Sequence, residues 1–131
     1  MKDETTPSES EWMIMEVFWS AQQPLTSREV IERLEKAMTP KMVRVLINRL
    51  CEKEILAYTI DKEDKRVYHY YVLKSKEECQ KEKSRKFVKS YFKGSQSNAV
   101  AALLQSANLS EEQIQELEEI LEKSKSKGGG I

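Results

Sequence analysis

The sequence predicts a mainly α-helical protein that carries one small β-hairpin. Apolar residues recur at helical spacing in three stretches before residue 54 and in three more after residue 75. Between these groups, the β-prone runs 55–60 and 66–73 flank a charged loop, which is the pattern of a hairpin. We therefore expect two modules, with three helices and a hairpin over residues 1–74 and a helical region over residues 75–131.

The 131 residues carry no net charge, but the charges are unevenly distributed along the chain. Lys and Arg set against Asp and Glu give about −5 for residues 1–35, about +4 for 36–74, about +4 for 75–93 and about −3 for 94–131. A basic middle favours a polyanionic partner such as nucleic acid, although basic blocks also occur on solvated faces.

Several classes of protein are disfavoured. No apolar run is long enough to span a membrane, and the acidic N-terminus is unlike a signal peptide, so we expect a cytoplasmic protein with no membrane insertion. Cys51 and Cys79 fall in different predicted helices and form no ligand pair, so free thiols are expected, with no metal site and no cofactor. Without a phosphate loop or a nucleophile–base pair, we do not expect an enzyme.

The first two helices are marked by capping boxes. Residues 1–7 are expected to be a frayed tail, after which Ser8 and Glu11 start a helix that runs to about residue 20. Thr26 and Glu29 start a second helix that runs to about residue 37. The side chains expected to face the core are Trp12, Met15, Phe18 and Trp19 from the first helix, and Val30, Ile31 and Leu34 from the second.

The third helix, residues 40–53, has a marked start and two unlike faces. Thr39 is a good N-cap, and Pro40 suits the first helical position. Apolar residues at i, i+3, i+4 and i+7 form its inner face: Val43, Leu46, Ile47 and Leu50. The outer face mixes cations, an amide and two apolar side chains: Lys41, Met42, Arg44, Val45, Asn48 and Arg49. We interpret this stretch as a DNA recognition helix; the alternative is a core helix with an ordinary basic exterior.

The hairpin completes a recognisable arrangement. Two helices joined by a short turn, the second of them basic, form a helix-turn-helix, and a following hairpin is the wing of a winged helix. The charged loop 61–66, called the wing below, would place Lys62, Lys65 and Arg66 near phosphates or the minor groove, unless it is only a solvated turn. His69, the single histidine, is expected to be packed or half-exposed, with no carboxylate partner.

The last three helices hold too few large side chains to bury a core alone. We therefore expect them to form a homodimer, which would present two recognition helices to a pseudo-palindromic site. The residues from 123 to 131 are expected to be a disordered tail. The dimerisation residues predicted are Phe87, Val88, Tyr91, Val100, Leu103, Leu104, Ile114, Leu117, Ile120 and Leu121.

The chain resembles the BlaI/MecI/CopY penicillinase-repressor group of bacterial winged-helix repressors. The resemblance covers nearly the whole chain and lies in the order and spacing of short motifs: Ser10-Glu11-Trp12 with Trp19, Pro24-Leu25-Thr26, Pro40-Lys41 through Asn48-Arg49-Leu50, Arg66-Val67-Tyr68, Ser75 to Cys79, and Leu109-Ser110-Glu111-Glu112. It implies a homodimeric repressor of double-stranded DNA operators that controls antibiotic-resistance, stress or copper genes. In the β-lactam branch, the resemblance implies induction by proteolysis under a membrane sensor-protease.

Three departures from the group bear on function. The chain has no cysteine after Cys79, whereas copper-responsive members carry a cysteine-rich site near the C-terminus. Ala102-Leu103 stands where β-lactam members are typically cut at an Asn-Phe bond, so it is the matching place for a proteolytic switch. Met42 and Val45 stand where members usually have threonines. The alternatives left open are a copper-responsive repressor without the usual cysteines, and a winged helix that acts through protein contacts only.

Overall fold

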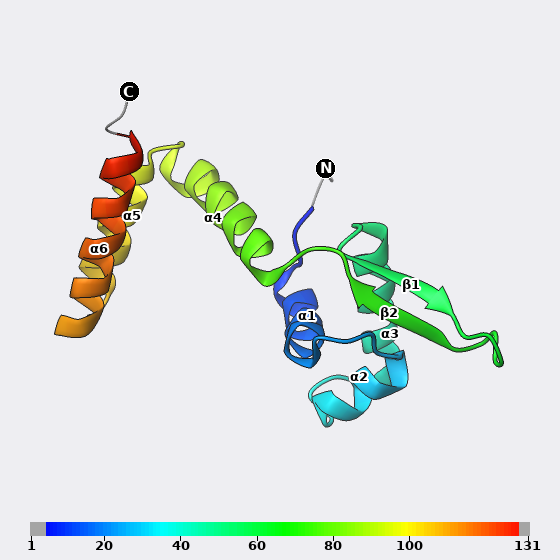
Figure 1. Ribbon diagram of the computed structural model, residues 1–131. Coiled ribbons are helices and arrows are strands. Elements are labelled where there is room, and N and C mark those ends of the chain that lie inside the picture. The colour runs from blue at the N-terminus through cyan, green and yellow to red at the C-terminus, as the bar shows by residue number, and fades with distance from the viewer. Residues whose placement is uncertain (1–4, 129–131) are drawn as a thin grey trace. The chain divides into compact units, whose positions relative to one another are not determined.

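The computed structural model describes residues 5–128 and confirms the predicted fold class (Figure 1). The elements are α1 (Glu9–Ala21), α2 (Ser27–Leu34), α3 (Pro40–Glu52), β1 (Leu56–Ile60), β2 (Tyr68–Val72), α4 (Lys76–Phe92), α5 (Gln96–Ser106) and α6 (Glu111–Gly128). The order of three helices, a hairpin and three helices follows the predicted one.

The helices begin where their caps predict. Both capping boxes of the first two helices are formed, and the Thr39 side chain accepts the Met42 N–H at 3.1 Å. The end of α2 differs from its prediction: the helix stops at Leu34, because Glu35 and Lys36 adopt left-handed backbone conformations with φ of 49° and 76°. Two consecutive left-handed residues cannot continue a right-handed helix.

One apolar core holds α1, α2, α3 and the hairpin together. The four residues predicted on the inner face of α3 are all buried. Trp12 and Trp19 are half-buried at the edge of this core, where their rings meet edge to face with centroids 5.1 Å apart. The fully or almost fully buried members are Ile14, Met15, Phe18, Leu25, Val30, Val43, Leu46, Ile47, Leu50, Ile55, Leu56 and Cys79.

The hairpin is antiparallel, with Leu56 opposite Val72 and Ile60 opposite Tyr68. Leu25, in the connection between α1 and α2, pairs with Tyr70 through two backbone bonds of 2.9 and 2.8 Å. This pairing covers the free side of β2 at one point and fixes the α1–α2 connection against the hairpin. The hairpin therefore has a fixed position beside α3, and its far end projects away from the helices (Figure 1).

The expectation of a frayed tail is wrong for residues 5–7; residues 1–4 lie outside the described part. Thr6 and Pro7 are buried. The Lys53 ammonium at the end of α3 donates to the Thr6 carbonyl at 3.1 Å and to the buried Glu11 carboxylate. The Lys74 ammonium donates to the Thr5 carbonyl at 3.0 Å. These lysines are distant in sequence, so no local pattern could have indicated that the segment is held.

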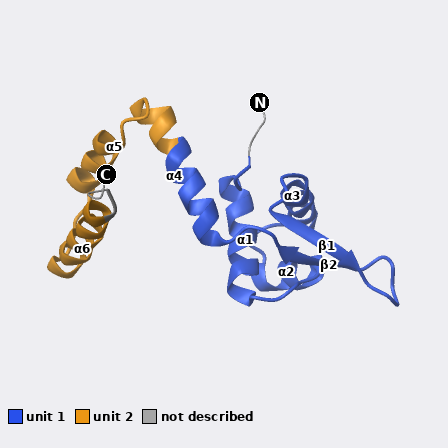
Figure 2. Cartoon of the chain, turned by 45° about the horizontal axis from the view of Figure 1, so that its top comes forward, with its two compact units in different colours: residues 1–86 blue, residues 87–131 orange. Residues whose placement is uncertain are grey.

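The chain divides into two compact units, residues 1–86 and 87–131 (Figure 2). The division falls within α4 and not at the predicted 74/75 boundary. The start of α4 belongs to the first unit because Cys79 is buried in its core and Lys76 pairs with Glu16 at 3.0 Å. Cys51 and Cys79 are both free thiols, and burial raises the pKa of each.

The second unit leaves most of its apolar side chains exposed. Gly94, with φ of 84°, separates α4 from α5, and Ser110 and Gln113 cap each other at the start of α6. The prediction of a disordered tail is wrong for residues 123–128, which continue α6. Lysine is a good helix former and suits the negative end of a helix dipole, so this short charged segment extends the helix. Residues 129–131 lie outside the described part.

Within residues 5–128, no helix is both long and apolar enough to cross a membrane.

Replacing Lys53 with Met should lower the free energy of unfolding by about 3 kcal/mol, because the Glu11 carboxylate would remain buried without its cation. Urea denaturation measures the change. Lys62→Met, at an exposed wing position, is the control and should change stability by less than about 0.5 kcal/mol. Equal stability of the two variants would show that this ion pair does not hold the fold.

Candidate nucleic-acid interface

In the first unit, the outer face of α3 is exposed to solvent. All six side chains predicted on this face are exposed, including Met42 at 47% and Val45 at 38%. The apolar side chains of the same helix are buried on its other face, so α3 cannot turn to hide Met42 and Val45 without exposing its core residues. Met42 and Val45 therefore stay exposed among the cations of this face.

The wing is a folded loop. Asp61 Oδ2 accepts the backbone N–H groups of Glu63 at 3.0 Å and Asp64 at 2.9 Å. Asp64 in turn accepts the backbone N–H of Arg66 at 3.0 Å and two guanidinium bonds, from Nε at 3.0 Å and from Nη2 at 3.1 Å. Side-chain carboxylates that bond nearby N–H groups in this way stabilise tight turns. The wing is therefore held in shape by bonds among its own residues.

These bonds divide the three predicted wing cations into two kinds. Arg66 is engaged with Asp64, and this pairing raises the pKa of its guanidinium and lowers that of the Asp64 carboxyl. Lys62 and Lys65 are exposed and have no ion pair in the described part of the chain. The Arg66 side chain is still 90% exposed, so its remaining donors face solvent.

The expectation that His69 lacks a carboxylate partner is wrong. Its Nε2 lies 3.0 Å from Asp61 Oδ1, and this bond is the largest cause of the lowered pKa of Asp61. The two residues meet because the hairpin register places β2 beside the loop that follows β1. His69 is half-exposed, as predicted, and acts as a support for the wing.

A shallow hollow lies between the start of α2, the outer face of α3 and β2. Arg44, Asn48 and Arg66 are among the site residues that the sequence predicts, whereas Arg28 is not, because the pattern of α2 predicts only a packed helix. The one local signal for Arg28 is its position as a cation in the first turn of the helix that precedes the basic helix. We call this concavity the arginine hollow; its lining residues are Thr26, Ser27, Arg28, Arg44, Asn48, Arg66, Val67, Tyr68 and Tyr70.

In the described residues, no three His, Cys, Asp or Glu side chains lie together in a way that could hold a metal ion. The site is therefore built from cations, amide and hydroxyl donors and exposed methyl groups.

A helix-turn-helix with an exposed basic second helix, followed by a folded hairpin, defines a winged-helix DNA-binding protein. The model of the penicillinase repressor family matches residues 7–123. The chain therefore belongs to this family of transcriptional repressors and is not an enzyme, which confirms the resemblance found in the sequence.

Two relatives illustrate the match. The chain is 28% identical to the methicillin resistance regulatory protein MecI of Staphylococcus aureus over 117 residues, which cover 88% of this chain and 93% of the relative. It is 30% identical to a penicillinase repressor of Bacillus licheniformis over 122 residues, which cover 92% of each. The crystal structure of YusO from Bacillus subtilis aligns with a TM-score of 0.49 at 19% identity, covering 92% of this chain and 75% of YusO, values too low to add to the assignment.

The wing should lose its internal bonds in acid. The pKa values of Asp61 and Asp64 are lowered in the folded wing, so both carboxylates stabilise it above their ordinary pKa of about 4 and lose this effect as the pH falls through the lowered values. In an NMR titration, the amide signals of Glu63 and Asp64 should shift with a midpoint below 4. Asp61→Asn is the control and should abolish the shift at Glu63; a midpoint at the ordinary value would contradict the prediction.

Proposed function

We propose that this chain is a homodimeric repressor that binds a pseudo-palindromic operator through the 40–53 recognition helix and the 61–66 wing. The observation that carries the proposal is the outer face of α3, where six side chains suited to DNA are all exposed. An α-helix fits the major groove, and a dimer would place two such helices about one helical turn apart.

Each side chain of this face has a chemistry that fits a part of the duplex. Lys41, Arg44 and Arg49 suit phosphates or guanine edges, and Asn48 suits an adenine edge or a supporting contact. Met42 and Val45 suit apolar contact with thymine methyl groups. Lys65 and Arg66 suit the backbone beside the minor groove. The exposed pair Met42 and Val45 is therefore where we expect operator choice to be decided.

The second unit is proposed as the dimerisation region. Its apolar side chains have few partners within the chain: Tyr91 is 74% exposed, Leu121 61% and Leu103 56%. Contiguous exposed apolar patches mark protein interfaces. Ala99 is the one side chain of α5 that is buried, so the unit has little core of its own among its described residues. A second copy would cover the same apolar stripes.

The regulated genes are proposed from the relatives. One relative is named a methicillin resistance regulator and another a penicillinase repressor. We infer that this chain acts in the cytoplasm on antibiotic-resistance or stress genes. A membrane sensor-protease system that cuts at Ala102-Leu103 would have to open α5 first, because both residues lie inside that helix and Ala102 is half-buried. A protease binds an extended backbone, so cleavage would depend on how often α5 opens.

Arg44→Ala should weaken binding to a duplex that the full-length chain selects from a random library, by about tenfold, without changing the dimer. Fluorescence anisotropy measures the affinity, and sedimentation measures the mass. Gln23→Ala, in the exposed α1–α2 connection, is the control. If no duplex is enriched, or if Arg44→Ala binds the selected duplex like the control, the exposed face of α3 would serve protein contacts instead.

Leu121→Glu should convert the dimer to monomer, because the charge would have to be buried in the proposed interface. The side chain is exposed in the single chain, so the helix itself should be unaffected, and circular dichroism checks this. Gln115→Glu introduces the same group on the opposite face of α6 and should leave the dimer intact. A dimer that survives Leu121→Glu at low micromolar concentration would contradict the assignment of this stripe.

A further inference from the structure

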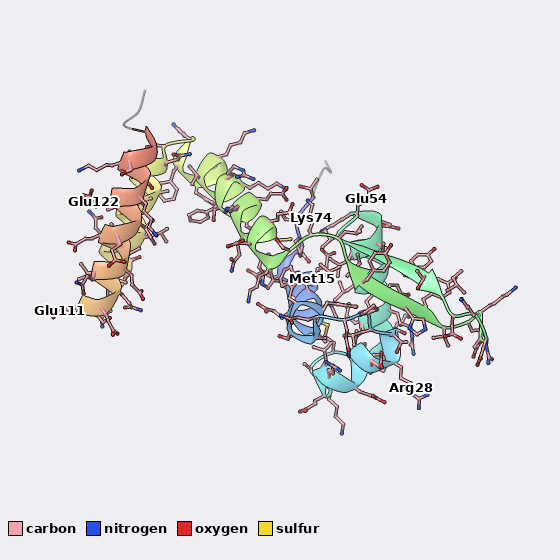
Figure 3. The ribbon with its side chains drawn as sticks, viewed as in Figure 1. Met15, Arg28, Glu54, Lys74, Glu111 and Glu122 are labelled. Carbon is pink, nitrogen blue, oxygen red and sulfur yellow. The ribbon has the colours of Figure 1, made fainter. Side chains whose placement is uncertain are left out.

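The arginine hollow concentrates positive charge from three separate elements. Arg28 comes from the first turn of α2, Arg44 from α3, and Arg66 from the wing, and no carboxylate is among the lining residues. Figure 3 shows the Arg28 side chain extending outward from the start of α2. Three guanidinium groups around one concavity repel one another, so an arrangement of this kind favours an anion between them.

The guanidinium groups keep free donors. Arg28 is paired with Glu32 at 3.8 Å, but the two side chains are 90% and 68% exposed, and an exposed pair of this length holds its members weakly. Arg44 has no ion pair within residues 5–128. Arg66 bonds Asp64 through Nε and Nη2, so Nη1 is still available, and the same two bonds hold its guanidinium plane in position.

Neutral donors complete the lining. Asn48 contributes an amide, and Tyr70 contributes a phenol, which is a hydroxyl donor at neutral pH. An anion with several oxygens in different directions would satisfy this set better than a single carboxylate would. A phosphate group has that shape.

We propose that the arginine hollow seats one phosphodiester group of the DNA backbone, and that Arg28 is a phosphate contact. This inference rests on the proposed function. If α3 enters the major groove and the wing lies over the neighbouring minor groove, the strand that separates the two grooves has to cross the concavity between them. A phosphate fixed there by residues of α2, α3 and the wing sets the depth and register of α3.

The test compares Arg28→Ala with Arg33→Ala, which removes the same charge from the same helix at an exposed position outside the hollow. Binding is measured as a function of salt on the selected duplex and on a scrambled duplex of equal length. Each subunit bound should lose one phosphate contact, so the slope of log K against log salt should fall by about 0.9 per subunit. At 0.15 M salt this is about fivefold in affinity per subunit. Arg28→Lys should recover part of the loss.

The loss should be equal on the two duplexes, because phosphates carry no sequence information. A scan of single neutral methylphosphonates along the selected duplex should find one position in each half-site that weakens the wild type more than it weakens Arg28→Ala, in which Arg44 and Arg66 still face the phosphate. An Arg28→Ala variant whose salt slope matches that of Arg33→Ala, or that loses as much affinity as the wild type at every methylphosphonate position, would overturn the proposal. Equal wild-type affinity for the two duplexes would instead refute operator recognition, and the scrambled duplex would still test Arg28.

Discussion

The contact between Lys53 and Glu11 is the constraint on which the first unit depends. Lys53 lies at the end of α3, and Glu11 belongs to the capping box that starts α1. The same ammonium group also holds the Thr6 carbonyl. One cation thus joins three segments and balances a carboxylate that would otherwise be costly to bury. Because α3 is held at its end as well as along its inner face, its outer face is presented in one fixed orientation.

The basic stretch 36–74 contains cations with different tasks. Lys53 and Lys74 are structural, since each donates to the backbone of the N-terminal segment. Arg66 is oriented by Asp64 within the wing. The others are exposed: Lys36 lies in the turn after α2, and the rest lie on the outer face of α3 and in the wing. A charge count along the sequence treats all of these alike, so it overstates the number of cations free for a polyanion.

The two units differ in how many of their apolar side chains are buried. In the first unit, apolar side chains from three helices and a hairpin are buried in one core, and Tyr70 and Leu25 join the hairpin to the helices. In the second unit, Ile114, Ile120 and Leu121 of α6 stay exposed along with residues of α5. A unit of this size buries too little surface to be stable alone. The small size therefore explains both why its apolar stripes stay exposed and why we propose that a second copy covers them.

The sequence by itself determined the elements and their caps, because these depend on residues three or four positions apart. Ser8 with Glu11, Thr26 with Glu29 and Thr39 before Pro40 mark helix starts in any context, and the apolar spacing of α3 decides which face is outward. Only the tertiary structure decided the fixing of residues 5–7 and the convergence of Arg28, Arg44 and Arg66. Those contacts join residues many positions apart, and such pairings arise from how the packed core places whole elements, which no local pattern encodes.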